Sequence, residues 1–110
     1  MSETQSLTQR QPTAPVRETV RPQLLFFFSP TSGASRRTEG FLAQVLQRNR
    51  NHATFRIVRI DADSYPHLTE QLGVTGIPTL LVVSEGEVRA RLAKPTGVQA
   101  IRDLLTPWLR

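Results

Sequence analysis

Apolar residues are organised along the chain from residue 22 onward. Positions 24–28 form a continuous apolar run whose length and aromatic content are typical of a strand covered on both faces. A polar break follows, and positions 34–47 then carry apolar residues at helical spacing, which predicts a helix. Positions 54–61 alternate between apolar and polar residues and predict a second strand. The first half of the pattern is therefore strand, helix, strand.

Shorter elements are predicted in the second half. A short helix is expected over 65–72, because Ser64 suits its N-cap and Gly73 suits the residue that ends it. Two further strands, at 79–83 and 88–92, are separated by four turn residues and form an antiparallel hairpin. This hairpin adds antiparallel strands to the sheet begun by the first two.

The pattern closes with an amphipathic helix. Thr96 is its expected N-cap, with Gln99 completing a capping box. Its apolar face consists of Val98, Ile101, Leu104, Leu105 and Leu109. The whole order is strand, helix, strand, helix, strand, strand, helix. Because a crossover helix joins the first two strands, we expect them to be parallel. We predict an α/β fold with a mixed four-stranded sheet flanked by helices.

Residues 1–21 differ from the rest of the chain. They contain prolines and scattered apolar residues with no strand or helix period, so they bury too little to offset the entropy of ordering. We expect a disordered or weakly docked tail over 1–21 and one domain over 22–110. A chain of 110 residues has the size of a single domain.

The absence of cysteine narrows the chemistry open to the protein. With no cysteine in 110 residues, disulfides, thiolate-bound zinc, iron–sulfur clusters and a thiol nucleophile are excluded. Only two histidines are present, and we expect neither a metal nor a cofactor. No apolar run approaches the roughly 18 residues of a membrane span, and the polar N-terminus has no signal-peptide pattern. The expected location is the cytoplasm.

The chain is basic, with 14 Lys and Arg against 9 Asp and Glu and a formal charge of +5. Lys94 is its only lysine. An excess of positive charge is typical of proteins that bind nucleic acid, so nucleic acid is a candidate partner. However, the arginines are spread over several predicted elements, and no exposed aromatic platform accompanies them. The pattern argues against nucleic acid and for a solvated surface.

One tetrapeptide carries a family signal. Gly76, Ile77, Pro78 and Thr79 stand between the short helix and a buried strand. A proline is tolerated at the first residue of a strand, and its peptide bond invites the cis form. This segment resembles the cis-proline segment of the thioredoxin family, and the resemblance continues in family order over 24–105. It implies a thioredoxin-like fold.

The departures from the family pattern concern its chemistry. The redox motif of the family, Trp-Cys-Gly-Pro-Cys, corresponds to residues 31–35, in which Ser32 and Ser35 replace both cysteines. A serine hydroxyl has no comparable anion population near neutral pH and forms no mixed disulfide. The buried carboxylate of the family corresponds to Phe26, and its helix-kinking proline to Gly40. We therefore expect no catalytic residue and no redox enzyme.

Two explanations of the serine pair compete. The chain is either a natural member that has lost thiol–disulfide chemistry, or a disulfide oxidoreductase of cell redox homeostasis in a serine-substituted form. A substitution of the thiols alone would leave their surroundings intact, whereas Thr31, Ala34, Phe26 and Gly40 have changed as well. Without a thiol whose proton it can accept, a buried carboxylate contributes only the unfavourable free energy of removing its charge from water. We favour the natural redox-free protein, acting as an adaptor or a chaperone-like binder.

The binding site implied by the resemblance is a groove formed by Thr31, Ser32, Gly33, Ile77 and Pro78. In the family, the backbone before the cis-proline pairs with an extended substrate peptide, a form of strand addition. We expect a protein or an extended peptide as the partner. The alternative is that the proline only shapes the turn.

A second candidate is the start of the first helix. Ser35, Arg36 and Arg37 could hold a phosphate or another small anion, since helix N-termini attract anions and arginine binds phosphate in a fork. The alternative is ordinary capping beside two solvated arginines, because no complete phosphate-loop pattern is present. Asp61 and Asp63 share a face but lack the further oxygen ligands of a metal site.

Overall fold

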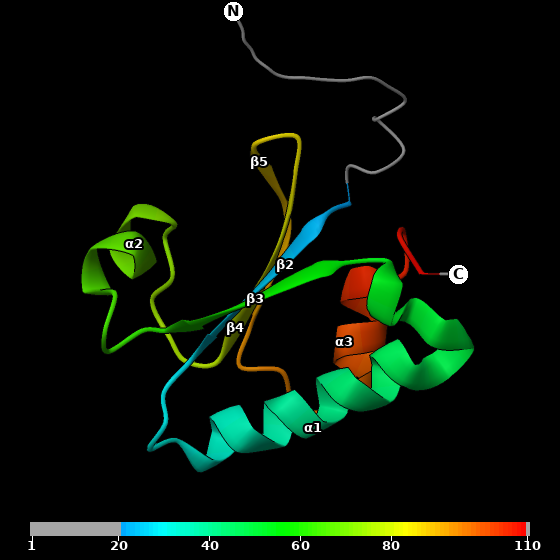
Figure 1. Ribbon diagram of the computed structural model, residues 1–110. Coiled ribbons are helices and arrows are strands. Elements are labelled where there is room, and N and C mark those ends of the chain that lie inside the picture. Colours follow the sequence, from blue (N-terminus) through cyan, green and yellow to red (C-terminus); the bar gives the residue numbers. More distant parts are fainter. Residues whose placement is uncertain (1–20, 110) are drawn as a thin grey trace, which may run out of the picture.

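The computed structural model describes residues 21–109, and its centre is a four-stranded sheet (Figure 1). The strands are β2 (Gln23–Phe28), β3 (Arg56–Asp61), β4 (Thr79–Ser84) and β5 (Glu87–Ala93), in the spatial order β3-β2-β4-β5. β2 and β3 are parallel, whereas β2–β4 and β4–β5 are antiparallel. The predicted mixed sheet is confirmed.

Two of the helices, α1 (Gly33–Gln47) and α3 (Val98–Leu105), cover one face of this sheet. α1 runs into the 3₁₀ helix η2 (Arg48–Ala53), and α2 (Pro66–Gln71) follows later in the chain. α1 and α3 contact each other on the same face (Figure 1). The predicted order of strands and helices is confirmed. The 3₁₀ helix η2 fills the segment between the predicted helix and the predicted second strand and was not itself predicted.

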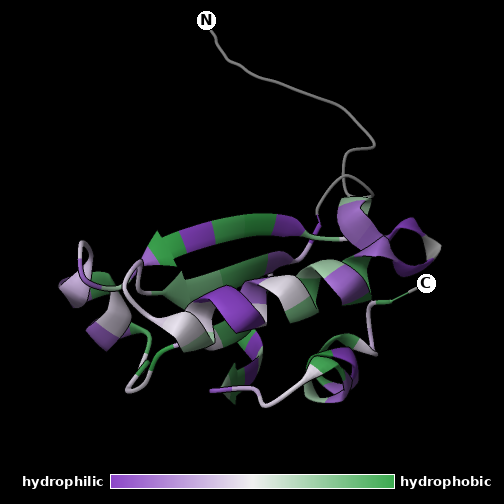
Figure 2. Cartoon of the chain, turned by 90° about the horizontal axis from the view of Figure 1, so that it is seen from below, coloured by the Kyte–Doolittle hydropathy of each residue, from purple (hydrophilic) through white to green (hydrophobic). Residues whose placement is uncertain are grey.

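Two apolar clusters sit on opposite faces of β2. Leu24 and Phe26 pack with α1 and α3, whereas Leu25 and Phe27 face the segment that follows α2. Successive side chains of a strand point to opposite faces, so the unbroken apolar run of β2 is required by burial on both faces. Figure 2 looks onto α1 from outside and shows polar residues on its outer side.

Helix starts differ from the sequence predictions. Ser64 is not the cap of α2, because the backbone N–H groups of Ser64 and Tyr65 both donate to the Asp61 carbonyl in a turn. The N-cap position falls to Tyr65, without a side-chain capping bond. The predicted end of this helix is confirmed, since Gly73 has a φ of 72°.

The last helix also begins without the predicted cap. Gly97, not Thr96, is the N-cap residue, and no side chain bonds to the first turn. The predicted capping box is absent, because the Gln99 amide donates instead to Asp103 at 2.8 Å.

Gly40 in α1 has no atom within 4 Å of a Cβ position. A side chain at this position would therefore meet no neighbour.

The predicted tail, apart from Arg21, lies outside the described residues, so the boundary at residue 22 stays a prediction. Within residues 21–109, none of the helices has the length and hydrophobicity needed to cross a membrane.

Candidate functional site

Two serines stabilise the loop between β2 and α1 through their side-chain hydroxyls. They stand at the positions that correspond to the redox cysteines of the family that the sequence resembles. Ser32 is the N-cap of α1, and its Oγ accepts a hydrogen bond from the Ser35 N–H at 3.0 Å. Ser35 is only 3% exposed, and its Oγ accepts from the Ser29 N–H at 3.1 Å. Both hydroxyls therefore bond within the protein and fix the path of the loop.

The position of the family's buried carboxylate is apolar in this structure. Phe26 is 1% exposed and its ring lies 5.7 Å from that of Phe28. The Asp63 carboxylate accepts a hydrogen bond from the Ser29 hydroxyl, just after β2, at 2.9 Å. No group of three His, Cys, Asp or Glu side chains among residues 21–109 is placed to hold a metal ion.

The segment before β4 has the predicted backbone form, because the Ile77–Pro78 peptide bond is cis. Its neighbours are engaged: the Pro78 carbonyl accepts from the Lys94 N–H at 2.7 Å, and the Gly76 carbonyl accepts from the Thr79 hydroxyl at 2.6 Å. Ile77 is different. Its backbone N–H and carbonyl have no hydrogen-bond partner in the described part of the chain. One donor and one acceptor are thus available at this point.

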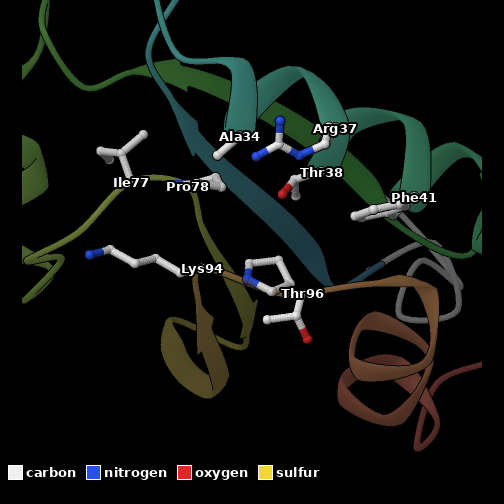
Figure 3. A pocket seen from close by; sticks show the side chains of 9 residues that line it. Ala34, Arg37, Thr38, Phe41, Ile77, Pro78, Lys94 and Thr96 are labelled. Carbon is white, nitrogen blue, oxygen red and sulfur yellow. The ribbon is translucent and has the colours of Figure 1, made fainter.

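Beside Ile77 lies a cavity of about 440 Å³ between α1, the cis-proline segment and the loop from β5 to α3 (Figure 3). We call it the cis-proline groove. It is lined by Ala34, Arg37, Thr38, Phe41, Ile77, Pro78, Lys94, Pro95 and Thr96. Its walls thus combine apolar side chains with two cations.

Only part of the predicted groove is found. Ile77 and Pro78 line it, but Thr31, Ser32 and Gly33 are not among its lining residues. Ser32 is occupied as the helix cap, which turns its hydroxyl toward the backbone of α1.

Residues further along α1 form the wall instead. Residues 34, 37, 38 and 41 share one face of the helix, because side chains three or four positions apart are neighbours. This spacing was a signal that the sequence already carried. Lys94 had no comparable signal.

The predicted anion site is only partly assembled. The guanidinium groups of Arg36 and Arg37 both lie within 4 Å of a Cβ position on Gly33, over the first turn of α1. Arg36 also donates to the Pro30 carbonyl at 3.4 Å. Ser35, in contrast, is buried and bonded to the loop. The anion site stays a prediction.

Comparison with known families decides the identity of the fold. The family model for thioredoxin matches residues 3–106. The chain belongs to the thioredoxin family. This member carries no cysteine in its 110 residues, so it lacks the thiols that disulfide exchange requires.

Solved thioredoxins have the same fold. The germline-specific thioredoxin Deadhead from Drosophila melanogaster superposes with a TM-score of 0.70 at 17% identity, covering 81% of this chain and 82% of its own. Mitochondrial thioredoxin 3 from Saccharomyces cerevisiae gives 0.68 at 17%, with 80% and 79% covered. A mutant thioredoxin from Halobacterium salinarum gives 0.65 at 22%, with 86% and 80% covered. At these identities the likeness concerns the fold alone.

Proposed function

We propose that this thioredoxin family member works without thiol–disulfide chemistry and binds an extended segment of another protein in the cis-proline groove. The observation that carries the proposal is the free backbone of Ile77. Its N–H and carbonyl have no partner among the described residues and lie beside a cavity of about 440 Å³. An extended peptide can pair with these two groups, as in strand addition.

The groove walls suit the side chains of such a peptide. Ala34, Phe41 and Pro78 supply apolar contact area in the same groove as Ile77. In an extended ligand, successive side chains point to opposite faces. One set can therefore enter the groove while the backbone pairs with Ile77. Main-chain bonds supply affinity in this mode, and the pockets supply specificity.

The test compares two variants of one helix. Peptides selected from a displayed random library are titrated into the labelled protein, and backbone amide shifts are followed by NMR. We expect shifts at Ile77 and Thr96. Ala34→Phe fills the groove and should weaken binding at least about tenfold. Ala43→Phe makes the same change on the same helix, outside the groove, and should bind like the wild type.

Two results would contradict the proposal. One is a selected peptide that leaves the Ile77 amide unchanged at saturation. The other is equal affinity of Ala34→Phe and wild type when both give folded, dispersed spectra. The matched Ala43→Phe variant separates a blocked groove from a general effect of an added aromatic ring.

A further inference from the structure

We infer that the ligand of the cis-proline groove is an acidic extended peptide, one that places Asp or Glu side chains against Lys94 and Arg37. This inference rests on the proposed function and specifies its ligand class. Two cations line the groove, and no carboxylate does. Neither the Arg37 guanidinium nor the Lys94 ammonium has a hydrogen-bond or ion-pair partner within residues 21–109.

Lys94 is held against the cis-proline segment by its own backbone. It adopts a φ of 50°, and its N–H donates to the Pro78 carbonyl at 2.7 Å. The side chain passes so close to Gly76 that a Cβ there would lie 2.7 Å from the Lys94 Cε. Glycine at this position therefore makes room for the lysine stem. The Lys94 Nζ would lie 3.5 Å from the same Cβ position, so the ammonium group stands beside Gly76, the residue before Ile77. Figure 3 shows the Lys94 and Ile77 side chains at the same end of the groove.

Arg37 supplies charge from the opposite wall, on α1 (Figure 3). The one acidic residue of this helix is Glu39, and its carboxylate pairs with Arg59 of β3 at 3.1 Å. Arg37 thus keeps its charge uncompensated. Thr38 beside it is 1% exposed, and its hydroxyl has no hydrogen-bond partner among the described residues. This buried hydroxyl lines the groove and can donate to a ligand oxygen.

The chemistry of these groups favours carboxylates on a peptide. A guanidinium and an ammonium form charge-assisted hydrogen bonds to carboxylate oxygens, which are stronger than neutral ones. The free N–H and carbonyl of Ile77 select a backbone that can pair with both. A single-stranded nucleic acid lacks such a backbone and needs aromatic stacking platforms. The groove offers one aromatic residue, Phe41, which is half-buried.

The probes are two capped heptapeptides, Thr-Val-Glu-Thr-Glu-Val-Thr and the same sequence with Gln in place of Glu. Each is titrated into the full chain, and the Ile77 amide is followed by NMR. Reductive methylation with labelled formaldehyde adds a second reporter. Lys94 is the only lysine, so it gives one side-chain signal apart from the α-amino group. We expect the Glu peptide to bind about fivefold tighter at low salt and to shift both reporters.

Charge-removal variants locate the effect. Arg37→Gln and Lys94→Gln should each reduce the preference for the Glu peptide, and together they should abolish it. Arg56→Gln removes an exposed charge outside the groove. Arg50→Gln removes a charge at a residue that, like Lys94, has a positive φ (59° against 50°), so it controls for the backbone conformation. Both controls should keep the preference. Raising the salt to about 1 M, where the screening length is about 3 Å, should weaken the Glu peptide selectively.

Several outcomes overturn the inference. Equal affinity of the two peptides, or equal losses in the groove and control variants, would show that the groove does not read acidic side chains. Peptide binding in the groove, and with it the proposed function, would then stand. Absence of any shift at millimolar Glu peptide also overturns it, and the library selection then decides the proposed function separately. Stronger competition by a short single-stranded DNA than by the Glu peptide would indicate a nucleic-acid ligand instead.

Discussion

Replacing Ser35 by alanine tests whether this serine, which stands at a redox position of the family, has a structural role. Its Oγ accepts from the Ser29 N–H at 3.1 Å, and the side chain is 3% exposed. Alanine removes the acceptor and leaves this backbone donor without its partner. A buried or half-buried donor without a partner costs about 2 kcal/mol. Alanine also favours the helix by about 0.5 kcal/mol over serine. We expect a net loss of about 1.5 kcal/mol.

Urea unfolding followed by circular dichroism measures this loss. With a denaturant slope of about 1.5 kcal/mol per M, the midpoint should fall by about 1 M. Ser35→Cys should lie between alanine and the wild type, because sulfur is a weak acceptor. Ser64→Ala is the control, since Ser64 is exposed and no side-chain capping bond forms at the start of α2. It should change stability by less than about 0.5 kcal/mol. Equal midpoints for Ser35→Ala and Ser64→Ala would refute the structural role of the Ser35 hydroxyl.

Two further variants probe the lost chemistry and the groove. The double variant Ser32→Cys with Ser35→Cys should reduce insulin disulfides slowly beside an active thioredoxin, because Phe26 fills the site of the family's buried carboxylate; equal rates would contradict this. Gly76→Ala should cost less than about 1 kcal/mol by urea unfolding, because its methyl group meets only the flexible end of Lys94, while reducing the preference for the Glu peptide. In a Lys94→Ala background, Gly76→Ala should not reduce the preference for the Glu peptide further. An unchanged preference in the single Gly76→Ala variant would rule out the contact between Gly76 and Lys94 as a determinant of this preference.

Much of the fold could be predicted because burial leaves a direct record in the sequence. The continuous apolar run at 24–28 follows from a strand covered on both faces. The helical spacing of apolar residues over 34–47 follows from a helix packed on one side. The residue at which a helix begins was harder to predict. Ser64 and Thr96 are good capping residues, but each stands one residue before the observed N-cap. Which residue caps a helix depends on local backbone angles, which the neighbouring turns determine.

The candidate site was predictable only where one segment carried it. The motif around Ile77 and Pro78 lies within four consecutive residues, so it could be read directly. The wall formed by α1 was not predicted, because the family motif covers only residues 31–35, whereas the helix face that lines the groove continues to Phe41.

The amino-acid sequence alone is enough to assign the thioredoxin family and the absence of its thiols, since both follow from local motifs and from a count of cysteines. Only the folded chain brings Arg37 and Lys94 into the same groove as the unpaired backbone N–H and carbonyl of Ile77. Antiparallel pairing of β4 with β5 returns the chain from the cis-proline segment to Lys94, and packing of α1 on the sheet adds the second cation. Such long-range contacts leave no periodic pattern in the sequence. A single charged residue reads the same in the sequence whether its side chain lines a groove or faces the solvent.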